Sequence, residues 1–214
     1  MSRFCGRSKK IKNPMMTSYL LLLLGAVTCP AAVWAQNNYV HGVELSVDGI
    51  TYDVTHTPGV IALSNAANEL LDQPIVRLDG TELTEAEYED LSVGGLEAGT
   101  LQQALLQTFT QEEYNALVQG KDVMRLLLVQ RSDGRIAEVA FFIRDSPRTA
   151  ALPPEKYALL ERNIKSYVRY SLTAEEKQLK FVRMEIILNF AKMRLFYVNP
   201  EGGTPIGPDA ELKE

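Results

Sequence analysis

The pattern that most constrains this fold lies in the carboxy-terminal half of the chain. Two apolar runs, 123–131 and 135–144, flank an Asp133-Gly134 turn signal. A Pro-initiated helical pattern follows at 154–169, and then an alternating run covers 180–190. Asp-Gly between two alternating runs is a strong hairpin signal, so this half predicts a strand–turn–strand–helix–strand unit.

Apolar residues occupy both faces of the first two predicted strands. Leu126 and Leu128 alternate with Leu127 and Val129 in the first strand. Strands that are apolar on both faces indicate a central position in a sheet with material packed on each side. We therefore predict an α+β fold, in which an antiparallel sheet of strands 123–131, 135–144 and 180–190 is covered by the 154–169 helix.

The preceding region predicts a hairpin and several short helices. The residues 43–54 alternate around Asp48-Gly49, and this hairpin is expected either to extend the sheet or to form a small lobe. Asn65–Leu71 is expected to form a short helix. Thr84-Glu-Ala-Glu87 and Thr110-Gln-Glu-Glu113 have capping-box spacing, which predicts helices beginning at both threonines. The second of them continues a helical pattern over 101–119, bent at Thr110.

The first 35 residues have the pattern of a secretory signal peptide. Five basic residues precede the apolar run Tyr19–Val27, and Val33-Trp34-Ala35 fits a signal-peptidase site. Cleavage is expected between Ala35 and Gln36. An uncleaved anchor, a lipoprotein modified at Cys29, and a start at Met15 or Met16 instead of Met1 are the alternatives.

Without residues 1–35 the chain has no cysteine, since Cys5 and Cys29 both lie in the leader. Disulfide staples and thiolate chemistry are thereby excluded for the mature chain. The sequence predicts export to the periplasm or cell surface of a Gram-negative bacterium, with no membrane span in the mature chain.

Charge is unevenly distributed in the mature chain, whose net charge is −10. Residues 36–120 contain fourteen acidic residues and one basic residue, whereas residues 121–198 contain fifteen basic and nine acidic residues. We expect an acidic region at 36–120 packed on a ββαβ core at 121–198, and a flexible tail at 199–214. The acidic balance disfavours nucleic-acid binding, which needs a concentrated basic face.

The candidate chemical residues are few. His41 and His56 lie near Asp48 and Asp53, but a zinc site needs three or four ligands, and the spacing favours surface histidines. Ser166 has no nucleophile motif around it, and the glycines at 94, 95 and 99 do not form a phosphate loop. The acidic run Glu85, Glu87, Glu89 and Asp90 is typical of a solvated helix, although paired carboxylates also serve glycoside hydrolysis. No catalytic, cofactor-binding or metal-binding residue is therefore assigned.

Several segments resemble a known group of proteins. The runs Leu126–Ile143, Leu152–Tyr157 and Leu160–Lys165, with Thr108–Glu113 before them, resemble a family of small secreted Bacteroides proteins of unknown function. The element order is also similar to that of the carboxy-terminal domain of TonB energy transducers, although the Tyr-Pro segment typical of TonB is absent. These resemblances imply a topology and supply no catalytic residues.

The function expected from the sequence is that of an exported, non-catalytic envelope protein that binds a partner, such as another envelope protein. An apolar patch around Phe196 and Tyr197 is one candidate surface. The alternative is an envelope hydrolase acting on glycan or peptide, with Asp53, His56 or the Glu85–Asp90 acids in a cleft. A structural or adhesin-associated protein is the third possibility.

Overall fold

The computed structural model describes residues 39–92, 94–144 and 152–193. The chain divides into two compact units, residues 1–34 and 35–214, and every described residue belongs to the second unit. The predicted cleavage point at Ala35 and Gln36, the patch at Phe196 and Tyr197, and the tail at 199–214 lie outside the described residues.

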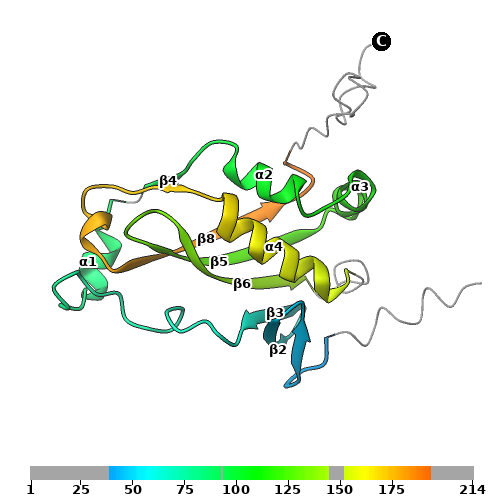
Figure 1. Cartoon of the computed structure of the whole chain (residues 1–214), viewed down its shortest axis with the longest axis horizontal. Coiled ribbons are helices and arrows are strands. Elements are labelled where there is room, and N and C mark those ends of the chain that lie inside the picture. Colours follow the sequence, from blue (N-terminus) through cyan, green and yellow to red (C-terminus); the bar gives the residue numbers. More distant parts are fainter. Residues whose placement is uncertain (1–38, 93, 145–151, 194–214) are drawn as a thin grey trace, which may run out of the picture. The chain divides into compact units, whose positions relative to one another are not determined.

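A six-stranded antiparallel sheet forms the centre of this unit (Figure 1). The strand order is β1-β2-β3-β6-β5-β8, and each neighbouring pair is antiparallel. These strands are β1 (Glu44–Val47), β2 (Ile50–Thr57), β3 (Val60–Asn65), β5 (Val123–Arg131), β6 (Ile136–Arg144) and β8 (Phe181–Asn189). A separate two-stranded sheet pairs β4 (Gly95–Leu96) with β7 (Tyr170–Ser171). The helices are α1 (Glu85–Glu89), α2 (Thr100–Leu106), α3 (Gln111–Gly120), α4 (Pro154–Tyr167) and the 3₁₀ turn η1 (Glu176–Gln178). The predicted α+β class is confirmed.

The amino-terminal hairpin extends the sheet. Asp48 and Gly49 have φ of 50° and 80°, so both turn residues adopt the left-handed conformation that a tight hairpin needs. After a second turn the chain forms β3, which the sequence did not predict, and β3 pairs with β6. Strands β1, β2 and β3 of the acidic region and β5, β6 and β8 of the ββαβ core therefore belong to one sheet.

The helix predicted for Asn65–Leu71 is wrong. β3 continues to Asn65, and turns follow. The side-chain oxygen of Asn65 accepts a hydrogen bond from the Ala67 N–H. The carboxylate of Glu138 in β6 accepts hydrogen bonds from the N–H groups of residues 69–71. These donors are satisfied by side chains, and an i to i−4 helical ladder does not form.

The two capping boxes are confirmed. Thr84 accepts from the Glu87 N–H at the start of α1, and Thr110 accepts from the Glu113 N–H at the start of α3, while each glutamate bonds back to the cap. The bend between α2 and α3 falls where the sequence predicts it.

Both faces of the sheet carry a core, as the apolar strands predicted. Met124, Leu126 and Leu128 are fully buried on the face covered by α2, α3 and α4. The opposite face carries a second core whose buried members are Leu71, Ile75, Val129, Ala140, Leu179, Phe181 and Val182. Residues 66–92 and 172–180, here called the loop layer, supply its outer half. Within residues 39–92, 94–144 and 152–193, no helix is long and apolar enough to cross a membrane.

Candidate functional site

The loop layer is tied to the sheet by a buried glutamate. Glu138 of β6 is 8% exposed, and its carboxylate accepts hydrogen bonds of 2.8–3.1 Å from the N–H groups of Glu69, Leu70 and Leu71. The Arg183 guanidinium of β8 donates to the Leu71 carbonyl at 2.7 Å. Charged groups paired with backbone in this way fix a loop that has little regular structure of its own.

A short irregular ladder holds the two halves of the loop layer together. Val76 pairs with Glu82, and Arg77 pairs with Leu179. The Lys180 N–H donates to the Val76 carbonyl at 2.9 Å. Residues of this ladder line two pockets.

The larger of these two pockets, here called the basic pocket, has a volume of about 500 Å³ and opens to solvent. Its lining residues are Leu70, Gln73, Pro74, Val76, Glu82, Arg131, Lys180 and Phe181. Among the described residues, the side chains of Arg131 and Lys180 have no hydrogen bond or ion pair. The pocket therefore combines an apolar floor with two cations that form no ion pair and with one carboxylate, that of Glu82.

The second pocket, here called the acidic pocket, has a volume of about 370 Å³. Its lining residues are Arg77, Leu83, Glu87, Asp90, Leu91, Glu175, Gln178 and Leu179. Glu87 is already engaged, because one carboxylate oxygen accepts from Thr84 and the other from Arg77 at 2.8 Å. The Thr84 backbone N–H, with Arg77 next in importance, lowers the pKa of Glu87 to about 2. Glu87 is thus held as a carboxylate at neutral pH.

Of the predicted acidic run, Glu87 and Asp90 line the acidic pocket, whereas Glu85 and Glu89 do not. The pocket adds a third carboxylate, Glu175, which the sequence did not single out. Glu175 accepts a hydrogen bond from the Ser92 N–H at 3.2 Å. All four residues of the acidic run are exposed, as predicted for a solvated helix, and two of them also line the acidic pocket.

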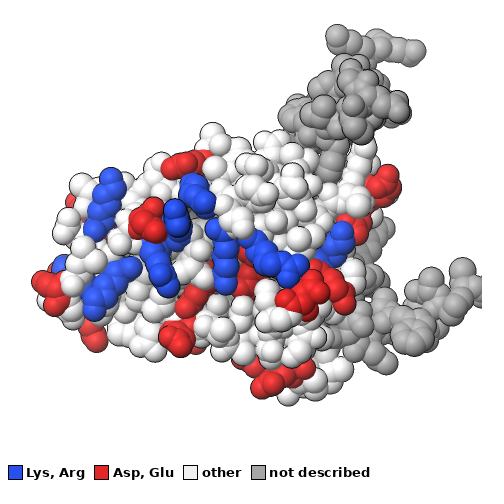
Figure 2. Space-filling view, in the orientation of Figure 1, with Lys and Arg blue, Asp and Glu red and all other residues white. Residues whose placement is uncertain are grey.

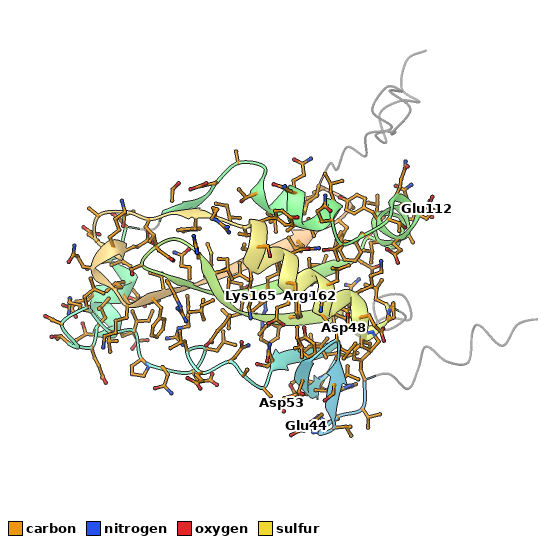
Figure 3. All side chains as sticks on the ribbon, in the orientation of Figure 1. Glu44, Asp48, Asp53, Glu112, Arg162 and Lys165 are labelled. Carbon is orange, nitrogen blue, oxygen red and sulfur yellow. The ribbon has the colours of Figure 1, made fainter. Side chains whose placement is uncertain are left out.

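The predicted histidine and aspartate candidates do not form one site. His41 Nδ1 accepts from the His56 N–H at 3.0 Å, so the two histidines are neighbours. Asp53 and His56 are three residues apart in β2 and so point to opposite faces. Asp48 instead pairs with Arg162 of α4 at 3.0 Å, away from Asp53 (Figure 3). Among the described residues, no group of three or more His, Cys, Asp or Glu side chains is arranged to hold a metal ion.

The face that carries α4 shows a band of Lys and Arg side chains with acidic side chains beside them (Figure 2). Three cations of α4 are paired: Lys156 with Glu113 at 2.7 Å, Arg162 with Asp48, and Lys165 with Glu161 at 2.6 Å. Glu161 of the same helix is only 1% exposed. It accepts further bonds from Tyr52 and Asn65, so it joins α4 to β2 and β3. Ion pairs compensate these charges, in contrast to those of the basic pocket.

The sequence assigned no binding role to Arg131 or Lys180 and did not reveal the apolar floor. Their juxtaposition depends on the ladder between the two halves of the loop layer, which no local pattern specifies. The one available signal for the pocket was the apolar residue Phe181, which follows the cation Lys180 in the sequence and lies opposite the cation Arg131 in the strand register.

A solved structure with a similar fold is that of a DUF5043 family protein from Bacteroides uniformis. It matches with a TM-score of 0.56 and 23% sequence identity, covering 71% of this chain and 87% of that chain. No family model matches the sequence, and no curated protein matches it. At this identity the likeness establishes a shared fold, which agrees with the resemblance to an uncharacterised Bacteroides family. The similarity to the TonB domain stays a prediction from element order.

Proposed function

We propose that this protein is an exported, non-catalytic binding module of the cell envelope of a Gram-negative bacterium, and that the loop layer is its binding surface. The basic pocket carries the proposal. It offers charge and apolar surface to a ligand, the combination that small-molecule binding sites use.

The leader pattern supports the location. A basic start, an apolar run and Val33-Trp34-Ala35 are typical of a secretory signal, and the remaining chain is free of cysteine. The fold shared with a Bacteroides protein is consistent with such a host.

Expression of the full chain in a Gram-negative host tests export. We expect a mature protein in the envelope fractions whose amino terminus is Gln36. The matched variant Ala35→Arg, which places a large charged residue where the peptidase needs a small one, should accumulate unprocessed. A wild-type protein that keeps its leader and stays in the cytoplasm would contradict the proposal.

The binding role has its own test. Cross-linking in the intact envelope should recover a partner or ligand with the wild-type protein, and much less of it with the Arg131→Gln/Lys180→Gln double variant. Equal recovery with both proteins would place binding elsewhere and remove the loop layer from the proposal.

One observation favours the alternative of an envelope hydrolase acting on glycan or peptide. The acidic pocket gathers Asp90 and Glu175 beside Glu87. A carboxylate whose pKa is lowered to about 2 cannot be the general acid and is a weak base, so Asp90 and Glu175 would have to supply the acid and the base. If the purified protein cleaves envelope glycan or peptide, and Asp90→Asn and Glu175→Gln each abolish the cleavage, this alternative replaces the non-catalytic proposal.

A further inference from the structure

We propose that the basic pocket binds a small organic acid, with its carboxylate held by Arg131 and Lys180 and its apolar body on the pocket floor. This inference deepens the proposed binding function by naming the class of ligand.

Both cations line the basic pocket. Arg131 is the last residue of β5 and lies directly opposite Phe181, the first residue of β8. Directly opposite residues share one face of a sheet, so Arg131 and Phe181 are on the same side. Lys180 immediately precedes Phe181 and lines the same pocket. A carboxylate between them would accept a bidentate bond from the guanidinium and a further bond from the ammonium.

The side chains of Arg131 and Lys180 form no ion pair within the described part of the chain. Several other cations there have acidic partners, as Arg77 has Glu87 and Lys156 has Glu113, whereas Lys121, Lys177 and Lys192 form no ion pair among the described residues. Two unpaired cations at one pocket repel each other, and an anion between them relieves that repulsion.

The apolar floor of the basic pocket favours a ligand that has an apolar portion. Phe181 is 4% exposed, and Leu70 and Val76 are partly buried beside it. A volume of about 500 Å³ falls in the range of small-molecule sites, which are lined mainly by apolar residues with a few polar groups that fix orientation. An inorganic anion would leave this floor in contact with water.

Glu82 limits the charge of the ligand. It lies opposite Val76 in the ladder and lines the pocket, so the ionised lining of Arg131, Lys180 and Glu82 has a net charge of +1. That charge matches a monoanion and disfavours polyanions, which Glu82 would repel. A carboxylic acid with an apolar body is the simplest chemistry that fits all three features.

The pocket is also preorganised. Leu70, one of its walls, donates its N–H to both oxygens of Glu138 at 2.9 Å. Phe181 and Arg131 belong to paired strands. Binding therefore does not have to order the backbone of the lining, which lowers its entropic cost.

Calorimetric titration of the purified mature chain with three probes tests the ligand class. Octanoate has both the charge and the apolar body, 1-octanol has only the body, and acetate has only the charge. We expect octanoate to bind at least about tenfold more tightly than either of the others, since a charged hydrogen bond typically contributes about that factor. Amide NMR signals of Val76, Arg131 and Lys180 should shift with octanoate.

Variants locate the site. Arg131→Gln and Lys180→Gln should each weaken octanoate binding by about tenfold, and 1-octanol binding by less than about twofold. Arg135→Gln removes one positive charge from the same hairpin outside the pocket, and it should leave octanoate binding unchanged. Circular dichroism and thermal melting show whether each variant is folded.

Equal binding of octanoate and 1-octanol, no detectable binding of octanoate, or octanoate binding that survives in the folded double variant would each overturn the inference. These results do not depend on export or partner capture. Failure of the envelope proposal would leave octanoate binding in place, and failure of octanoate binding would leave export in place.

Discussion

Glu138, Glu161 and Glu176 are buried carboxylates that accept hydrogen bonds from distant parts of the chain. Glu138 holds the loop layer, Glu161 joins α4 to the sheet, and Glu176 accepts from the N–H groups of Gly94 and Thr173. A buried charge is costly unless it is hydrogen-bonded. Each of these glutamates therefore fixes the position of the segments that donate hydrogen bonds to it.

Urea unfolding tests whether Glu138 holds the loop layer in place. Glu138→Ala should lower the free energy of unfolding by about 3 kcal/mol, because it leaves the N–H groups of residues 69–71 without their acceptor. Glu69→Ala, an exposed change in the same loop, should alter it by less than about 0.5 kcal/mol. Similar values for the two variants would show that Glu138 does not hold the loop.

The Tyr52–Glu161 contact makes a second residue-level prediction. The Tyr52 hydroxyl donates to Glu161 Oε2 at 2.7 Å, and both residues are buried. A double-mutant cycle with Tyr52→Phe and Glu161→Gln should give a coupling free energy of about 1–2 kcal/mol. Coupling near zero would mean that the two groups act independently in anchoring α4.

At the scale of elements, the β5–β6 turn meets the chain that follows α4. A Cβ on Gly134 would lie 2.6 Å from the Tyr170 carbonyl oxygen, and φ at Gly134 is +79°. Gly59, between β2 and β3, has φ of +78° and no neighbouring atom within 4 Å. Substitution by alanine would cause similar backbone strain at both positions. Only at Gly134 would the added Cβ also clash with backbone atoms.

The two alanine variants therefore separate strain from contact. Gly59→Ala should lower the free energy of unfolding by about 1 kcal/mol, the typical cost of a left-handed conformation for a residue with a side chain. Gly134→Ala should cost about 2 kcal/mol more, because the turn or the Tyr170 segment must move. Equal losses would contradict the tight approach of the two segments.

Elements with local signals were predictable from the sequence. The Asp48-Gly49 hairpin and the two capping boxes depend on residues within a few positions of each other. β3 was missed; it pairs with its neighbour β2 and with the distant β6, and only the second pairing lies beyond the reach of a local pattern. The wrong helix at Asn65–Leu71 has the same origin, since Glu138, 68 residues after Leu70, decides that segment.

The candidate site was less predictable than the fold because it depends on contacts between residues that are far apart in the sequence. Each pocket joins the 70–91 segment to residues near 131 or 175–181. The acidic run was visible in the sequence, but its meeting with Glu175 was not. Likewise Arg131 was visible, but its position beside Lys180 above an apolar floor depends on long-range pairing.

For the whole molecule, buried tyrosines set the alkaline limit of stability. Burial raises the pKa of Tyr39, Tyr52, Tyr114, Tyr157 and Tyr170 above the ordinary value of 10.0. Their hydroxyls keep their protons in the folded state at pH values where the unfolded chain releases them. The unfolded state then binds fewer protons than the folded state, so the free energy of unfolding decreases as pH rises.

This linkage predicts a cooperative alkaline transition. The stabilising contribution is fully present below about pH 10 and is lost progressively above it. In a titration from about pH 8 to about pH 12, the tyrosinate absorbance of these residues should appear together with the loss of far-ultraviolet circular dichroism. Tyr157→Phe removes one of these buried ionisable groups, so the slope of unfolding free energy against pH above pH 10 should become shallower. If every tyrosine instead titrates gradually near pH 10 while the circular dichroism stays native, then water reaches these rings, and the two-sided core does not protect them.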